Sequence, residues 1–155
     1  MCIIVLGKNK YINNKKIRDT NEVPYCAIVT TLLSGCASTK LTSPPSDYVG
    51  NLPDVYKTEL NTLNDEPSTP FRGGVQTFQF DEEKSLLTVV FRLPNPRWSW
   101  NTYKSDAEKE LFPFVCQVFG QEIENGLGVR YWYSGNGGFA TDVVTKETCL
   151  ELNLS

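Results

Sequence analysis

Leu86-Leu87-Thr88-Val89-Val90-Phe91-Arg92-Leu93 is rich in β-branched and aromatic residues, which favour an extended strand. Upstream, Phe78 and Phe80 are separated by Gln79, so the apolar side chains of residues 75–80 share one face of a second strand. The polar run 81–84 joins the two segments as a short loop. The sequence therefore predicts a β-hairpin over residues 75–93.

A helix is predicted after the hairpin, over residues 105–124. Ser105 and Glu108 have the spacing of a capping box, in which a hydroxyl and a carboxylate each satisfy a free backbone N–H. Apolar residues recur at three- and four-residue steps and form one stripe: Leu111, Phe112, Val115, Val118, Phe119 and Ile123. Pro113 lies about two turns inside, where proline kinks a helix or makes it restart. Gly126 and Gly128 are expected to stop the helix.

Two further strands are predicted over residues 129–133 and 139–146, with Asn136-Gly137 as a tight-turn dipeptide between them. The resulting order, β-β-α-β-β, predicts an α+β fold with a four-stranded, mostly antiparallel sheet and one helix packed on one face. We place this folded domain at residues 71–155.

Residues 36–70 have the composition of a flexible tether. They are rich in proline, serine, threonine, asparagine and aspartate, and their sparse apolar residues follow no period. A short helix over residues 54–60, with Val55, Leu60 and Leu63 docked on the domain, is the alternative for part of this segment.

Composition excludes several classes of function. The chain of 155 residues contains no histidine, so it cannot form a Ser-His-Asp or Cys-His site, and it lacks the commonest zinc ligand. We expect no catalytic residue, no metal and no cofactor, and therefore a protein that is not an enzyme. Lys and Arg number 15 against 18 Asp and Glu, a net charge of −3, which argues against nucleic acid as a partner.

The N-terminal part resembles the signal peptide of a bacterial lipoprotein. Leu33-Ser34-Gly35-Cys36 ends an apolar run that is too short for a membrane span, which needs about 20 residues, but that has the length of a signal h-region. Five basic residues precede the run: Lys8, Lys10, Lys15, Lys16 and Arg18. The alternative is a buried segment that happens to end in Gly-Cys.

The lipoprotein resemblance implies that residues 1–35 are a cleaved leader and that the thiol of Cys36 carries a diacylglycerol. Residues 36–70 would then be a lipidated tether. Ala37, rather than aspartate, follows the cysteine, which in that family implies sorting to the outer membrane, with the protein facing the periplasm. The acyl chains would anchor the protein to the membrane permanently.

Cys116 and Cys149 are the two cysteines outside the presumed leader and lipid site, since Cys2 and Cys26 belong to the leader. In the oxidising compartment that the resemblance implies, such a pair is most simply one disulfide, which would tie the predicted helix to the end of the sheet. Two buried free thiols are the alternative.

The cysteine-bearing helix, Gly128 before an aromatic strand, and the end Lys146-Glu147-Thr148-Cys149, together with the lipoprotein-like leader, resemble the disulfide-containing α+β pilotins of type II secretion. The resemblance implies noncovalent binding to a segment of an outer-membrane secretin. The partner would thus be an outer-membrane or periplasmic protein.

Two other functions remain open. Gly128-Val129-Arg130-Tyr131 resembles a motif of periplasmic lysozyme inhibitors, but those folds are mostly all-β, so the predicted helix favours the pilotin interpretation. The second is a lipoprotein without a defined partner.

Aromatic residues are the candidate partner-binding residues: Trp98, Trp100, Tyr131, Trp132 and Tyr133. Trp98 and Trp100 flank a serine in a proline-bounded loop, where at least one is expected to be exposed. On a strand, Tyr131 and Tyr133 face one way and Trp132 the other, so one set is expected on the surface. The alternative is that Trp132 is in the core and the tyrosines lie flat on the sheet.

Overall fold

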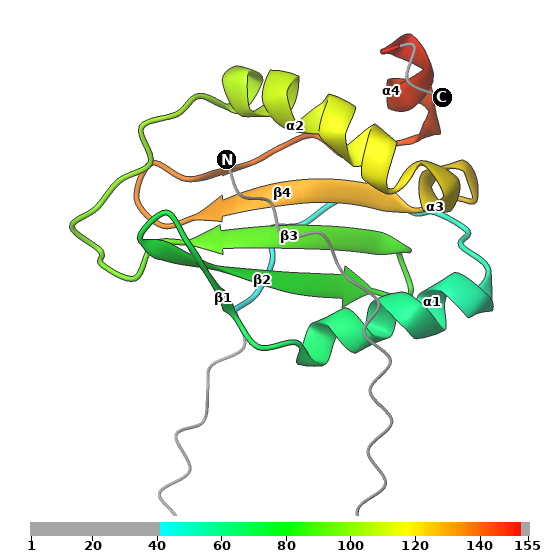
Figure 1. Ribbon diagram of the computed structural model, residues 1–155, viewed down its shortest axis with the longest axis horizontal. Helices are drawn as coiled ribbons and strands as arrows, with labels where there is room; N and C mark the ends of the chain where they lie inside the picture. Colours follow the sequence, from blue (N-terminus) through cyan, green and yellow to red (C-terminus); the bar gives the residue numbers. More distant parts are fainter. Residues whose placement is uncertain (1–40, 153–155) are drawn as a thin grey trace, which may run out of the picture. The chain divides into compact units, whose positions relative to one another are not determined.

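Five strands form one mixed sheet in the order β1-β2-β3-β4-β5 (Figure 1). The computed structural model describes residues 41–152, so the predicted leader and Cys36 lie outside the described residues. The strands are β1 (Thr69–Phe71), β2 (Gly74–Asp81), β3 (Leu86–Arg92), β4 (Gly128–Ser134) and β5 (Phe139–Ala140). The α+β class and the hairpin of β2 with β3 are confirmed. The predicted number of four strands is wrong, because β1 lies inside the presumed tether.

The pairing of β3 with β4 is parallel, whereas the other neighbours in the described sheet are antiparallel. A parallel pair requires a crossover connection, which is usually helical. Here the crossover contains α2 (Lys104–Val118) and α3 (Gly120–Glu124). The helix predicted over residues 105–124 is therefore present as two pieces.

Two details of the predicted helix are corrected. The N-cap of α2 is Tyr103, which makes no side-chain cap hydrogen bond, so the capping box is wrong; Glu108 instead accepts a hydrogen bond from the backbone N–H of Asp142 at 2.8 Å. Pro113 lies within α2 without ending it. The break comes at Phe119, whose backbone leaves the helical region (φ −110°, ψ 18°) before α3 begins at Gly120.

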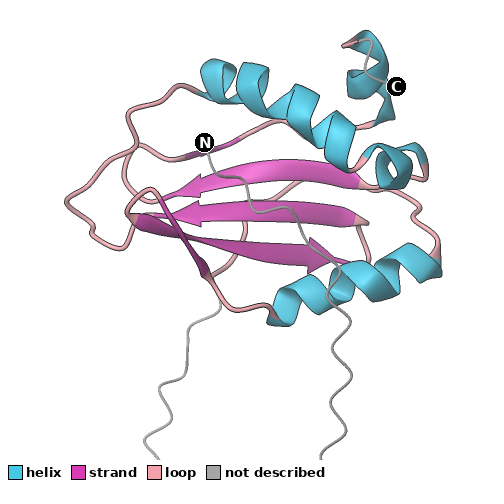
Figure 2. Ribbon diagram, viewed as in Figure 1, coloured by secondary structure: helices cyan, strands magenta, loops and turns pink. Residues whose placement is uncertain are grey.

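The main hydrophobic core lies on one face of the sheet. The register aligns Phe80, Leu87 and Val129 in a row across β2, β3 and β4, and these three side chains are buried. Val115 and Cys116 of α2 join the same cluster, as do other residues of the helices and of the sheet: Ile123, Leu127, Val89, Phe91, Tyr131 and Tyr133. The crossover thus covers the face to which the alternating apolar residues point (Figure 2).

Residues 41–70 are folded, which corrects both the predicted tether and the domain boundary at residue 71. They contain α1 (Asp54–Asn61), the 3₁₀ helix η1 (Thr62–Asp65) and β1. Leu52, Leu60 and Leu63 are buried in the main core, so the alternative of a short docked helix is confirmed for Leu60 and Leu63, whereas Val55 is exposed and does not dock. Asn64 also exchanges two side-chain hydrogen bonds with the backbone of Phe80, at 2.8 and 3.1 Å, before the start of β1. These contacts make the segment part of the folded unit.

Residues 41–46, here called the strap, cover the other face of the sheet. Gln79 Nε2 donates to the carbonyl of Leu41 at 2.8 Å, and Arg130 Nη2 donates to the carbonyl of Pro44 at 2.6 Å. All six residues from Leu86 to Phe91 of β3 are consequently buried. The prediction of one helix packed on one face of the sheet is therefore incomplete, because the strap covers the second face.

Cys116 and Cys149 form the predicted disulfide. Its second half lies in α4 (Lys146–Glu151), so the bridge joins α2 to α4 and not directly to the sheet. The strand predicted over residues 139–146 is limited to the two residues of β5. Beyond it, the hydroxyl of Thr141 accepts the N–H of Tyr131 at 2.9 Å and so replaces a backbone partner in the ladder.

Replacing both cysteines, as Cys116→Ser with Cys149→Ser, is expected to lower the free energy of unfolding by about 3–4 kcal/mol, since the bridge closes a loop of 33 residues. Denaturant unfolding of the oxidised parent and the double variant measures the difference. Equal midpoints would contradict a stabilising role for this bridge.

Leu60→Ala is expected to destabilise the protein by about 2–5 kcal/mol, because it empties a site that is 7% exposed. Val55→Ala on the same helix is the matched control and should change stability by less than about 0.5 kcal/mol, since Val55 is 72% exposed. Thermal or denaturant unfolding compares the two. A loose tether would instead leave both variants as stable as the parent.

Candidate functional site

Three arginines and two tryptophans lie at one end of the sheet, here called the arginine–tryptophan end: Arg72, Arg92, Arg97, Trp98 and Trp100. They come from the β1–β2 turn, the last residue of β3, and the loop of residues 93–103 that leads into α2. Figure 1 shows the turn and the loop at the same end of the strands. The fold thus brings these three separate segments to the same end of the sheet.

Trp100 anchors the loop to the sheet. Its ring meets the buried ring of Tyr133 edge-on at 4.9 Å, and its Nε1 donates to the carbonyl of Ser134 at 3.1 Å. The backbone N–H of Trp100 donates to the carbonyl of Asn136 at 3.0 Å. Aromatic pairs of this kind contribute about 0.5–1.5 kcal/mol beyond their buried area. The side chain and the backbone of Trp100 therefore both fix the loop in one position. A preorganised binding surface requires such fixing.

Trp98 is the exposed tryptophan of this end, and Tyr103 in the same loop is also exposed. The Trp98 side chain is 50% exposed, and its backbone N–H donates to the carbonyl of Asn95 at 3.0 Å within a turn. The ring lies against the β1–β2 turn, since a Cβ added at Gly73 would come within 3.3 Å of it. Gly73 also has φ +81°, a conformation that glycine adopts without strain. A glycine is thus needed here both for the turn and for the seat of the tryptophan.

The arginines make this end positive on an otherwise acidic unit. Arg72, Arg92 and Arg97 are exposed, and both ion pairs found within residues 41–152 belong to Lys104. Residues 41–152 carry nine Lys and Arg and sixteen Asp and Glu, yet no acidic residue occurs in residues 67–80, 84–105 or 125–141, the segments that contain this end and the strands leading to it. A local positive surface of this kind favours a negatively charged partner.

The structure separates the five predicted contact residues. Trp98 is exposed and Trp100 is partly exposed, and both belong to the arginine–tryptophan end. Tyr131 and Tyr133 are only 5% and 9% exposed and lie in the core beneath the helices, so the expectation that they contact a partner is wrong. Burial also raises the pKa of Tyr131 well above its usual range. Trp132 is half-buried on the opposite face, which the strap covers.

Sequence reasoning missed the three arginines. Each is isolated in the sequence, and only the fold brings them together. The signal that could have found them is the absence of Asp and Glu from the three segments around them.

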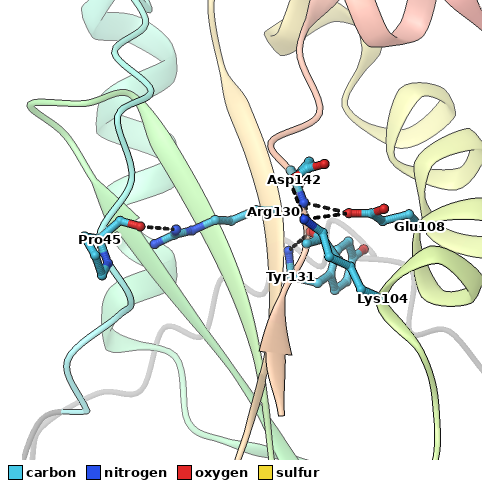
Figure 3. Close-up of polar contacts among 7 residues, drawn as sticks. Pro45, Lys104, Glu108, Arg130, Tyr131 and Asp142 are labelled. Carbon is cyan, nitrogen blue, oxygen red and sulfur yellow. Dashed lines mark hydrogen bonds and ion pairs between the residues drawn. The ribbon is translucent and has the colours of Figure 1, made fainter.

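Near this end, Lys104 forms an ionic clasp with Asp142, at 2.5 Å, and with Glu108, at 3.6 Å (Figure 3). The hydrogen bond that Lys104 donates to Asp142 raises the pKa of Lys104. The clasp joins the start of α2 to the segment after β5, and such exposed pairs contribute less than about 1 kcal/mol. We assign it a structural role, because it only connects two elements of the fold.

Among the described residues, no group of three or more His, Cys, Asp or Glu side chains is placed to hold a metal ion. No helix of residues 41–152 combines the length and the apolar character needed to cross a membrane.

Comparisons with protein-family models, with curated proteins and with solved structures found no match for this chain.

Proposed function

We propose that this protein is a lipid-anchored envelope protein that binds an acidic segment of an outer-membrane or periplasmic protein, in the manner of a pilotin. The arginine–tryptophan end is the observation that carries the proposal. It combines an exposed tryptophan, three exposed arginines without ion pairs in the described chain, and a loop held by Trp100. Tryptophan and arginine are the residues most often found at the energetic centres of protein interfaces.

The Cys116–Cys149 disulfide supports an oxidising location. The lipoprotein-like segment that ends in Cys36 supports a membrane anchor. Since residue 41 already belongs to the folded unit, only four residues, 37–40, lie between a lipid on Cys36 and that unit. The five residue steps from position 36 to position 41 reach at most about 18 Å when fully extended. The anchor would therefore hold the domain close to the bilayer, and it would not let the domain search widely for its partner.

Expression in a bacterial host with a lipoprotein pathway is expected to yield a protein that begins at Cys36, carries acyl chains on that residue and lacks two hydrogens for the disulfide. Mass spectrometry of the membrane fraction measures all three features. The Cys36→Ala variant should lose the acyl mass. An intact 155-residue polypeptide in the cytosol, with free thiols and no lipid, would contradict the lipid-anchor proposal.

Binding to the secretin of the source bacterium is expected to weaken at least tenfold in Trp98→Ala and in Arg92→Gln with Arg97→Gln, because these variants remove the aromatic anchor or two positive charges. Lys109→Gln is the matched control, since Lys109 is an exposed cation on α2, outside the loop of residues 93–103. Calorimetry or co-precipitation with the full chain provides the comparison. Salt should weaken the parent complex more than that of the double arginine variant.

Equal binding by all of these variants would show that the secretin uses another surface. Inhibition of a muramidase by the purified protein, without secretin binding, would instead favour the inhibitor function.

A further inference from the structure

A second positively charged feature lies on the opposite face of the sheet, beneath the strap. Strap residues and sheet residues together line a cavity of about 490 Å³, whose lining includes Ser43, Gln79, Lys84, Thr88 and Arg130. Gln79, Thr88 and Arg130 form one row across β2, β3 and β4, because the register pairs Gln79 with Thr88 and Thr88 with Arg130. The floor of the cavity is therefore a polar row on rigid strands.

Arg130 is a buried cation whose hydrogen bonds all go to uncharged oxygens. Its residue is 5% exposed. Nε donates to Thr88 Oγ1 at 3.1 Å, and the two terminal nitrogens donate to the carbonyls of Pro44 and Pro45 at 2.6 and 3.2 Å. Figure 3 shows the side chain reaching from β4 toward Pro45, on the side away from Tyr131. No carboxylate of the described chain lies within ion-pair distance of it.

An uncompensated buried charge is costly, and in proteins such charges are normally paired. A guanidinium has five N–H donors, of which three are used here, so two remain for another acceptor. Burial lowers the pKa of Arg130, and the field of Asp81 opposes that shift, but arginine remains protonated. The buried charge thus calls for an anion that the described chain does not supply.

Lys84 provides the second positive charge of the same cavity. Its Nζ donates to the carbonyl of Ser46 at 2.6 Å, again an uncharged oxygen, and retains two further N–H donors. The Ser43 hydroxyl donates to Gln79 Oε1, whereas the Ser46 and Thr88 hydroxyls act as acceptors, for the N–H of Tyr48 and for Arg130, and so keep a donor for a ligand. Asp81 also lines the cavity, and it is exposed, with its Oδ1 accepting the backbone N–H of Lys84. The lining therefore carries two positive charges against one negative charge.

We infer that this cavity binds a phosphate group carried by a small molecule or by a lipid headgroup. Arginine and lysine with nearby hydroxyls are the donors that phosphate oxygens prefer. The volume of about 490 Å³ exceeds what a lone phosphate fills and lies in the range of small-molecule pockets. This inference does not depend on the partner proposed for the arginine–tryptophan end, which lies at one end of the strands.

The test uses the full chain and two free probes, inorganic phosphate and glycerol 3-phosphate, each compared with chloride at equal ionic strength. Calorimetry is expected to detect saturable binding, and the thermal midpoint should rise with phosphate and not with chloride. Lys84→Gln and Arg130→Lys should each weaken binding about tenfold, since a hydrogen bond to a charged group is lost. Arg97→Gln is the matched control and should bind phosphate like the parent.

A second arm uses vesicles of phosphatidylcholine with and without phosphatidylglycerol. Binding that needs phosphatidylglycerol and is lost in Lys84→Gln identifies a lipid headgroup as the source, whereas binding of the free probes alone identifies a soluble ligand. If Arg130→Lys does not fold, as judged by circular dichroism, the binding measured for Lys84→Gln alone decides whether the cavity binds phosphate. Absence of binding in both arms, or equal binding by the parent and Lys84→Gln, overturns the inference.

Discussion

The parallel pairing of β3 with β4 is the constraint from which the rest of the architecture follows. Seven consecutive residues of each strand are in register, from Leu86 with Gly128 to Arg92 with Ser134. Because parallel neighbours need a crossover, residues 93–127 must carry the chain from the last residue of β3 back to the end of the sheet where β3 and β4 both begin. That return places α2 and α3 over one face and leaves the loop of residues 93–103 at the end where both strands finish. The exposed arginines and Trp98 lie at that end.

Burial of β3 on both faces explains why the sheet is covered by the crossover helices on one side and by the strap on the other. A strand that reads as a continuous apolar run needs cover on each side. The crossover helices cover one side, and the strap covers the other through hydrogen bonds from Gln79, Lys84 and Arg130 to its carbonyls. Pro44 and Pro45 suit this role, since proline lacks an N–H and offers only an acceptor. The strap is thus held by polar donors, while the helices are held by apolar packing.

The fold could be predicted from the sequence where its periodicity was strong. The hairpin of β2 and β3 and the helix that bears Cys116 follow from local patterns, and the disulfide follows from the cysteine count in the oxidising compartment that the lipoprotein resemblance implies. The folded state of residues 41–70 was indicated only by the alternative of a short helix over residues 54–60, because it depends on three leucines that dock on distant parts of the chain. Composition alone made this segment look unfolded.

The site was predicted only in part, for a related reason. Trp98 and Trp100 stood out because they are aromatic and lie between prolines. Tyr131 and Tyr133 were predicted to contact a partner but lie in the core. Alternation along a strand identifies two faces but does not say which face the helices cover. Arg130 was not singled out as a ligand residue, because its burial depends on a strap 86 residues upstream, whose Pro44 carbonyl it contacts.

Photo-crosslinking in living cells tests most directly whether the arginine–tryptophan end binds a partner. The full chain would carry Trp98→p-benzoylphenylalanine, with Lys109→p-benzoylphenylalanine as the matched control. We expect a discrete adduct with one envelope protein from position 98 and none from position 109. An adduct from position 109 alone, or none from either position, would contradict it.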